Sequence, residues 1–302
     1  MKSVIVKNIS KSYEKVQAVK DISFEVEKGE LFGLIGPDGA GKTTIFRILT
    51  SLLLPDQGEA SMENLNVVSD YKIIRKITGY MPGRFSLYQD LTVEENLNFF
   101  ATVFGVTVDE NYELIKNIFD QIAPFKKRLA GKLSGGMKQK LALSCALIHK
   151  PKVLILDEPT TGVDAVSRKE IWEMLQDLKT KGITILVSTP YMDEASLCDQ
   201  VALIQHGNIM EINSPEKIIS KFKHNLYSLK TANKQKLIDD LRSFEHSNSV
   251  FAFGDSIHYT DKRKNIEIQV IVNYLKNKNH STIEAEKIKP NIEDCFMDLM
   301  KN

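Results

Sequence analysis

The stretch ELFGLIGPDGAGKTTIFRILTSLL, residues 30–53, decides the fold. Its first part, residues 30–36, is a short apolar run that ends in glycine, which is typical of a buried parallel strand. Its last part carries Ile45, Ile48 and Leu49 at helical spacing. A buried strand, a glycine-rich turn and a helix therefore follow one another, as they do at the start of an α/β unit with a parallel sheet.

The turn GPDGAGKTT, residues 36–44, matches the phosphate-binding pattern G-x-x-x-x-G-K-[ST]. Its glycines let the backbone bend tightly, so that N–H groups point at phosphate oxygens, and the helix that follows adds its positive end. The strand and helix on either side argue against a chance glycine-rich turn. The residues predicted to hold the phosphates of ATP are Gly36, Pro37, Asp38, Gly39, Ala40, Gly41, Lys42, Thr43 and Thr44.

A second apolar strand, residues 152–159, ends in an acidic pair. We expect Lys42 to neutralise the β and γ phosphates, and Thr43 and Asp157 to hold Mg²⁺. Glu158 is placed to act as general base toward the attacking water. An acidic pair at a strand end can also cap a helix, but its combination with a phosphate loop favours catalysis of ATP hydrolysis.

The rest of the first domain repeats the alternation of strand and helix. A helix within residues 167–182 and a third apolar strand at 183–189 predict a parallel or mixed sheet. Residues of about 85–150 are mostly helical, and Thr92 followed by Glu95 is the signature of a capping box.

After about residue 222 the order becomes β-α-β-β-α-β, the split βαβ pattern of a ferredoxin-like domain. A last amphipathic helix, NIEDCFMDLM, follows. We therefore predict two domains, residues 1–222 and 223–302.

The composition argues against several classes of protein. The formal net charge of the 302 residues is +1, which leaves no electrostatic footprint for nucleic acid. Cys145, Cys198 and Cys295 lie far apart, so neither a zinc site nor a disulfide framework is indicated, and a reduced, cytoplasmic setting fits best. No apolar run approaches the roughly 18–20 residues of a membrane helix. A membrane part would have to come from another chain.

The stretch LSGGMKQK, residues 133–140, discriminates between ATPase families. Together with the phosphate loop and LILDEP at 154–159, it resembles the ATP-binding cassette (ABC) ATPases over roughly residues 1–222. The resemblance implies a mixed-sheet core, an antiparallel N-terminal sheet and a helical subdomain. It also implies two cassettes paired head to tail, with ATP between the phosphate loop of one and the signature of the other. The further residues that the resemblance assigns to nucleotide or partner contact are Tyr13, Ser134, Gly135, Gly136 and Asp164.

Two residues differ from the family pattern at positions that usually take part in catalysis. Gly83 replaces the usual glutamine of the Q-loop, and Pro190 replaces the usual switch histidine. Nothing in the sequence says that Gln89 substitutes. Asp38, where asparagine is commoner, should mildly weaken phosphate binding. Each lost donor typically costs about 2.7–4 kcal/mol of transition-state stabilisation. The chain's own site is therefore predicted to bind ATP and to hydrolyse it slowly.

The resemblance extends to the ATPases of drug-resistance and multidrug exporters, and to the first cassette of bacterial tandem-cassette efflux ATPases. It implies a membrane permease as partner, facing residues 83–105, and a location at the cytoplasmic face of the cell membrane. An intact signature beside a degenerate site favours a hetero-pair of cassettes, with a homodimer as the alternative. Two other functions stay open, a regulatory nucleotide-binding subunit and a soluble ABC ATPase without a transport role.

Overall fold

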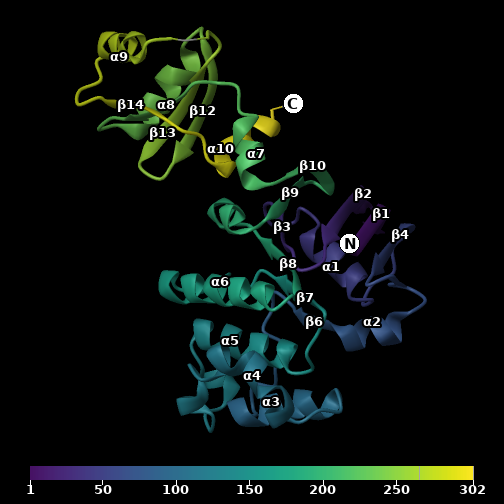
Figure 1. Ribbon diagram of the computed structural model, residues 1–302. Helices are drawn as coiled ribbons and strands as arrows, with labels where there is room; N and C mark the ends of the chain where they lie inside the picture. Colours follow the sequence, from purple (N-terminus) through teal and green to yellow (C-terminus); the bar gives the residue numbers. More distant parts are fainter. Residues whose placement is uncertain (265, 302) are drawn as a thin grey trace. The chain divides into compact units, whose positions relative to one another are not determined.

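The computed structural model describes residues 1–264 and 266–301. The chain separates into two compact units, Met1–Pro215 and Glu216–Asn302 (Figure 1). The predicted boundary after residue 222 lies later than this division, because the short helix α7 (Pro215–Ser220) packs with the second unit. Residues 265 and 302 of the predicted second domain lie outside the described residues.

The first unit contains an antiparallel sheet with the strand order β2-β1-β4-β5. Its strands are β1 Lys2–Tyr13, β2 Val16–Glu27, β4 Gln57–Met62 and β5 Leu65–Asn66. Val4, Val6 and Ile9 of β1 are buried, whereas Ile5, Lys7 and Asn8, which lie between them, are partly or fully exposed. This alternation is typical of a sheet that is buried on one face.

The central sheet has the strand order β10-β9-β3-β8-β7-β6. Its strands are β3 Leu31–Ile35, β6 Thr78–Met81, β7 Val153–Asp157, β8 Thr184–Thr189, β9 Gln200–Gln205 and β10 Asn208–Asn213. All neighbours are parallel except β9 and β10, so the predicted mixed sheet is confirmed. Every residue of β3, β7 and β8 is buried, which explains their continuous apolar sequence.

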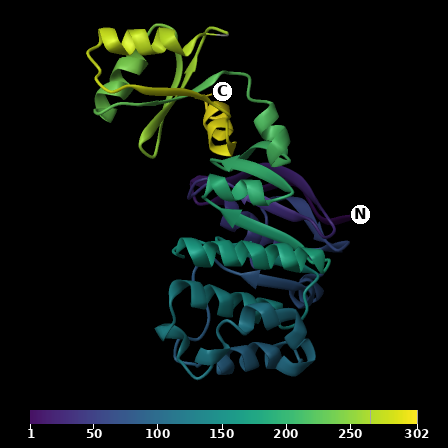
Figure 2. The ribbon, with the colours of Figure 1, turned by 60° about the vertical axis from the view of Figure 1, so that its left-hand side comes forward.

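The helices of the first unit cover this sheet and build the predicted helical subdomain. They are α1 Lys42–Leu49, α2 Tyr71–Ile77, α3 Val93–Val103, α4 Val108–Phe119, α5 Gly135–Leu147 and α6 Ala165–Thr180. The 3-10 helices are η1 Ala123–Phe125, η2 Ala130–Lys132 and η3 Met192–Leu197. Figures 1 and 2 show α3, α4 and α5 grouped at one end of the unit. The capping box of Thr92 and Glu95 is present at the start of α3.

A single apolar cluster joins the antiparallel sheet to the central sheet around α1. It includes Val4 of β1, Phe24 of β2, Phe32 of β3 and Phe46 of α1, all buried. The rings of Phe24 and Phe32 stack with their centroids 5.2 Å apart. This core holds the turn before α1 rigidly against both sheets.

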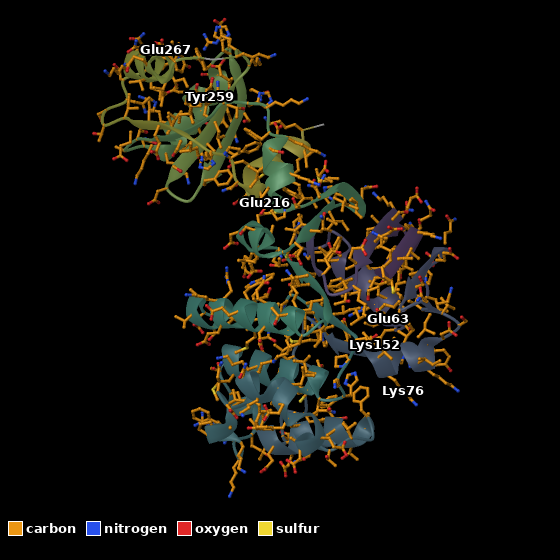
Figure 3. The ribbon with its side chains drawn as sticks, in the orientation of Figure 1. Glu63, Lys76, Lys152, Glu216, Tyr259 and Glu267 are labelled. Atoms are coloured by element: carbon orange, nitrogen blue, oxygen red, sulfur yellow. The ribbon has the colours of Figure 1, made fainter. Side chains whose placement is uncertain are left out.

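The second unit has the predicted split βαβ order. Its elements after α7 are β11 Leu226–Lys230, α8 Lys234–Ser243, β12 Ser247–Phe253, β13 Ser256–Asp261, α9 Ile268–Asn277, β14 Glu284–Ile288 and α10 Ile292–Leu299. The antiparallel sheet order is β12-β13-β11-β14, as in ferredoxin-like domains. Tyr259 of β13 (Figure 3) is fully buried in its core.

Candidate nucleotide-binding site

The phosphate loop joins the end of β3 to the start of α1. A Cβ atom at Gly36 would lie 2.0 Å from the carbonyl oxygen of Ile204, and one at Gly41 would lie 2.4 Å from that of Ala18. Gly41 also has a φ of 108°, in the left-handed region that favours glycine. The loop therefore needs both glycines for its close approach to β9 and β2.

The side chain of Lys42 is buried inside this loop. Its Nζ donates to the carbonyl oxygens of Gly36, at 2.7 Å, and of Pro37, at 3.0 Å. It also lies 3.4 Å from Oε1 of Glu158. The ammonium thus lies at the phosphate loop, where it can meet an anionic phosphate, and protein oxygens balance its charge.

A pocket of about 220 Å³ opens beside Lys42. Its lining consists of Ala18, Gly39, Ala40, Gly41, Lys42, Thr43, Thr44 and Glu158. Pro37 and Asp38 lie exposed at its margin. The loop glycines, the cation and the hydroxyls fit a triphosphate, and the hard oxygen donors of Thr43 and Asp157 fit Mg²⁺.

Tyr13 ends β1 close to the same helix. Its Oη lies 3.5 Å from Oγ1 of Thr44, and its ring is 42% exposed. An exposed ring next to the phosphate loop is free to stack on a planar base. The structure thus places Tyr13 at the loop, and its contact with adenine stays a prediction.

The acidic pair lies at the end of β7, the second strand from β3. Asp157 is buried and accepts a hydrogen bond of 2.6 Å from Oγ of Ser188. The Glu158 N–H donates to Oγ of Ser188, at 3.0 Å, and to its carbonyl oxygen, at 3.1 Å. Glu158 has a φ of 54°, an uncommon conformation for a residue other than glycine, so these two bonds hold a strained backbone.

Sequence reasoning missed Ser188. It pairs directly with Asp157 in the parallel register of β7 and β8. The sequence feature that could have revealed Ser188 is a hydroxyl residue at the end of an apolar strand, at the same edge of the sheet as the acidic pair.

Tyr80 of β6 was missed as well. Burial, with the nearby Asp157 carboxylate, raises the pKa of Tyr80 to about 12. The phenol is therefore neutral and keeps its proton next to Asp157 at physiological pH.

The two departures from the family pattern lie at the same edge of the sheet. A Cβ atom at Gly83 would be 3.2 Å from the carbonyl oxygen of Asp157 and 3.7 Å from its carboxyl carbon. Pro190 directly follows β8 and is partly buried. Gln89 packs instead on Gly131 of η2, whose N–H it accepts through its carbonyl oxygen at 2.9 Å.

The signature residues lie at the start of α5. Ser134 is the N-cap of α5, and its Oγ accepts from the N–H of Met137 at 3.3 Å. A Cβ atom at Gly135 would meet the carbonyl oxygen of Gly162 at 2.9 Å. Among the described residues, none of this motif lines the pocket beside Lys42.

Asp164 caps α6 next to the signature. It accepts from the N–H of Ser167 at 3.0 Å, and this backbone hydrogen bond lowers the pKa of its carboxyl group. A Cβ atom at Gly136 would lie 2.5 Å from Oγ of Ser167. The N-terminal ends of α5 and α6 therefore lie close together.

Comparison with known sequences finds relatives that agree with one another on the family. Residues 19–161 match the family model described as ABC transporter. A probable multidrug ABC transporter ATP-binding protein of Escherichia coli is 36% identical over 291 residues, which cover 94% of this chain and 49% of that protein. The chain thus spans about half the length of this relative. The Nod factor export ATP-binding protein I of Rhizobium sp. is 33% identical over 296 residues, which cover 96% of this chain and 94% of that protein.

Solved structures with the same fold are also cassettes. An ATP-binding subunit of an ABC transporter matches with a TM-score of 0.66 and 28% identity, over 72% of this chain and 92% of that one. A dimeric cassette in a post-hydrolysis state, bound to ADP and Pi, matches with a TM-score of 0.64 and 25% identity. The match covers 70% of this chain and 98% of that one. No helix in the described part of our chain is long and apolar enough to cross a membrane.

Proposed function

Because this chain belongs to the family of ABC transporter ATP-binding proteins, we propose that it is the ATP-binding subunit of an exporter that powers a separate membrane permease. One observation carries the proposal. The strand ends of β3 and β7 bring the buried Lys42 ammonium within 3.4 Å of the Glu158 carboxylate, beside a glycine cradle. A cation that can bind phosphate and a carboxylate that can act as a base are thereby held in one pocket.

Binding of ATP exchanges the partners of Lys42. The β and γ phosphates replace the carbonyl oxygens of Gly36 and Pro37 as acceptors, because a negatively charged phosphate oxygen attracts the ammonium more strongly than a neutral carbonyl oxygen does. Thr43 and Asp157 would hold Mg²⁺, which supplies charge neutralisation at the phosphates. Thr44 bonds a phosphate oxygen, and Tyr13 stacks on the base.

Hydrolysis then depends on Glu158. Once Lys42 turns to phosphate, the Glu158 carboxylate is free to accept a proton from the water that attacks the γ-phosphorus. The two hydrogen bonds to Ser188 fix the backbone that carries this carboxylate. Because this base is already held in position, the protein around it does not have to reorganise during the reaction.

We also propose that this site turns over slowly. Gly83 supplies no side chain above Asp157, and Pro190 supplies no donor at the end of β8. Each missing donor typically costs roughly 10²–10³ in rate. A regulatory subunit that binds ATP without useful hydrolysis is the second candidate, and the same two residues favour it.

The signature would complete the site of a second cassette. Ser134, Gly135 and Gly136 begin α5, whose N-terminal end attracts anions, and they do not line the pocket beside Lys42 among the described residues. Asp164 lies beside them at the start of α6. We propose a head-to-tail hetero-pair in which this chain lends its signature to a partner with a complete site.

A largely apolar groove of about 220 Å³ supports a permease contact at the cytoplasmic face of the cell membrane. Its lining includes Phe85 and Leu87 after β6, Phe100 of α3, Phe104 at the C-cap of α3, Ala142 of α5, and His149 just after α5. The His149 ring stacks on Phe104 with a centroid distance of 3.8 Å, and burial lowers its pKa, so it is neutral at physiological pH. An apolar helix of the permease suits this groove.

The decisive experiment measures Mg-ATP binding and turnover by the purified chain, with Lys42→Ala as the blank. We expect binding with turnover no faster than about 0.1 per second, below the ~10 per second of typical enzymes. Brisk turnover that Glu158→Gln abolishes would instead mean a complete self-pairing ATPase. Co-purification with a permease separates a transporter subunit from a soluble ABC ATPase.

A further inference from the structure

The side chain of Glu194, in η3, lies in the interior of the first unit, outside the pocket beside Lys42. It is 2% exposed. Its Oε2 accepts a hydrogen bond from Oγ1 of Thr160, at 3.0 Å, and another from Oγ1 of Thr189. Its Oε1 lies 3.7 Å from Nε of Arg168. A buried carboxylate is costly unless it is paired and hydrogen-bonded, and these three partners meet that condition.

A carboxylate suits this place because all three partners approach it as donors. They are two hydroxyl groups and a guanidinium. An ionised carboxylate only accepts hydrogen bonds, whereas the amide of a glutamine, which has the same size, must direct its NH₂ group at one of these partners. The substitution Glu194→Gln therefore keeps the shape of the side chain and disturbs its contacts.

Thr160 anchors the turn that follows the acidic pair. We call residues 158–164 the Thr160 turn. Thr160 is fully buried, whereas its neighbour Thr161 is exposed. The N–H of Thr161 donates to the carbonyl oxygen of Glu158 at 3.2 Å, and Oγ1 of Thr161 donates to Oε2 of Glu158 at 3.3 Å. The place of the Glu158 carboxylate therefore depends on a turn that Glu194 holds at a buried hydroxyl.

The same carboxylate also holds the chain that follows β8. Thr189 is the last residue of β8, and its Oγ1 accepts from the N–H of Tyr191 at 3.1 Å, across Pro190. The Arg168 guanidinium lies over the ring of Tyr191, with 4.2 Å between Cζ and the ring centroid. Glu194 thus joins three segments: the Thr160 turn, the end of β8 and the first turn of α6.

The contacts of Glu194 are separate from those that receive the phosphates. Among the described residues, the lining of the pocket beside Lys42 includes Glu158 but neither Glu194 nor any of its three partners. Loss of the Glu194 carboxylate should therefore leave the phosphate loop intact and loosen Glu158. Hydrolysis is sensitive to such a change, because a misplacement of about 1 Å can cost roughly 10² in rate.

We propose that Glu194 is a positioning residue for ATP hydrolysis. Its carboxylate fixes the Thr160 turn, and the turn fixes the Glu158 carboxylate. Glu158 takes the proton of the water whose oxygen bonds to the γ-phosphorus while the bond to ADP breaks. Glu194 contributes nothing to the binding of nucleotide. The proposal rests on the proposed ATPase function and adds to it a residue that touches neither the nucleotide nor the water.

The test compares the unaltered full chain with Glu194→Gln. Calorimetry gives the Kd of Mg-ATP. Single-turnover release of labelled phosphate, with the chain in excess over ATP, gives the rate of hydrolysis. We expect the Kd to change by less than about twofold and the rate to fall by about tenfold or more. Amide hydrogen exchange should become at least about tenfold faster in the Thr160 turn and stay unchanged in the phosphate loop.

Two further variants separate positioning from stability. Thr160→Val removes the hydroxyl through which Glu194 acts, so it should lower the rate in the same way. The double variant should be no slower than the slower single variant, within about twofold. Glu170→Gln is the matched control on α6, because Glu170 pairs with Lys140 of α5 at 2.6 Å, outside the Thr160 turn. It should leave the Kd, the rate and the exchange in the turn unchanged.

Unfolding midpoints, followed by emission of Trp172, the sole tryptophan of the chain, show whether each variant folds. If Glu194→Gln does not fold, Thr160→Val decides by itself. The proposal is overturned by an unchanged rate, by equal effects of Glu170→Gln, or by an Mg-ATP Kd that weakens as much as the rate falls. In the last case, Glu194 would support the whole fold.

Two results separate this proposal from the proposed function. If the unaltered chain hydrolyses ATP no faster than Lys42→Ala, there is no hydrolysis for Glu194 to assist, and the proposal fails while ATP binding stands. If the unaltered chain binds no Mg-ATP, the proposed function itself fails. Hydrogen exchange then still decides whether Glu194 holds the Thr160 turn.

Discussion

Gly83 and Pro190 show how much of this site depends on single side chains. The backbone around both is in place: Gly83 lies against Asp157, and Pro190 leaves β8 next to Ser188, the partner of the acidic pair. We propose that what the chain lacks at these positions is two donors to the γ-phosphate of bound ATP. The deficit is therefore local and should be repairable by substitution.

Restoring the two side chains should raise turnover. We expect Gly83→Gln together with Pro190→His to increase the Mg-ATP turnover number of the purified chain by about 10² or more. The Cβ atom of the new glutamine needs only a shift of a few tenths of an ångström by Asp157. Steady-state phosphate release measures the change, with Glu158→Gln added to the double variant as control. Unchanged turnover would show that other parts of the chain limit hydrolysis.

Ser188 should contribute to stability through the acidic pair. Ser188→Ala removes the donor to the buried Asp157 carboxylate and one acceptor of the Glu158 N–H, and we expect a loss of about 1–3 kcal/mol in the free energy of unfolding. Urea unfolding followed by Trp172 emission measures it. Ser144→Ala is the matched control, because this buried hydroxyl donates only to the Lys140 carbonyl oxygen of its own helix. Equal losses in both variants would argue against a special role of Ser188.

At the scale of elements, strand ends and helix starts carry the candidate site. The carboxyl ends of β3, β7 and β8 meet at one edge of the sheet because these strands are parallel neighbours. The helices α1, α5 and α6 begin with residues that attract anions or cap the helix. Side chains on loops are thereby placed by rigid elements, which is what catalysis requires.

Ser134 tests whether the start of α5 serves stability, phosphate binding or both. Ser134→Asp keeps a good N-cap, so the free energy of unfolding should stay within about 0.5 kcal/mol, while Ser134→Ala should lower it by about 1 kcal/mol. A carboxylate facing the phosphate of a second cassette should nevertheless abolish ATP-dependent dimerisation, whether with the partner cassette or with a second copy of this chain. Analytical ultracentrifugation with and without Mg-ATP measures it. Dimerisation that survives Ser134→Asp would mean that the signature does not meet phosphate.

The whole molecule consists of two units, each with its own core. The core of the second unit contains Tyr227, Leu229 and Tyr259, whereas the sole tryptophan lies in the first unit. Fluorescence therefore reports on the first unit, and far-UV circular dichroism on both. Asp261, at the end of β13, accepts from Tyr259 and from Arg263 and joins the core of the second unit to its surface.

Asp261→Asn should destabilise the second unit alone. The loss of a buried, charge-assisted network should lower its free energy of unfolding by about 1.5–3 kcal/mol, seen by circular dichroism, with the Trp172 transition unchanged. A shift of both transitions together would show that the units unfold as one.

The pH dependence of the same unit follows from Asp261. Burial raises the pKa of this carboxyl group, but the hydrogen bonds from Arg263 and Tyr259 outweigh burial and lower it below its ordinary value of 3.8. Because the folded pKa is depressed, the stabilisation is present above about pH 4 and is lost as the pH falls through the folded value. Circular dichroism between pH 5 and 2 should show a weaker acid dependence in Asp261→Asn.

The sequence by itself determined the phosphate loop, the acidic pair, the signature and the order of strands and helices in the second unit. These features depend on neighbouring residues: a glycine's allowed φ, the period of apolar side chains, and the spacing of a capping box. The two departures, Gly83 and Pro190, could be read from the same local patterns.

Only the tertiary structure decided which distant residues meet. Ser188 lies beside Asp157 because β7 and β8 pair in parallel register, and the glycine at position 36 is needed because Ile204 of β9 approaches it. Trp172 of α6 and Leu197 of η3 line one hollow because these two elements pack near each other. Such contacts join residues far apart along the chain, and their geometry depends on the packing of the whole unit, which no local pattern encodes.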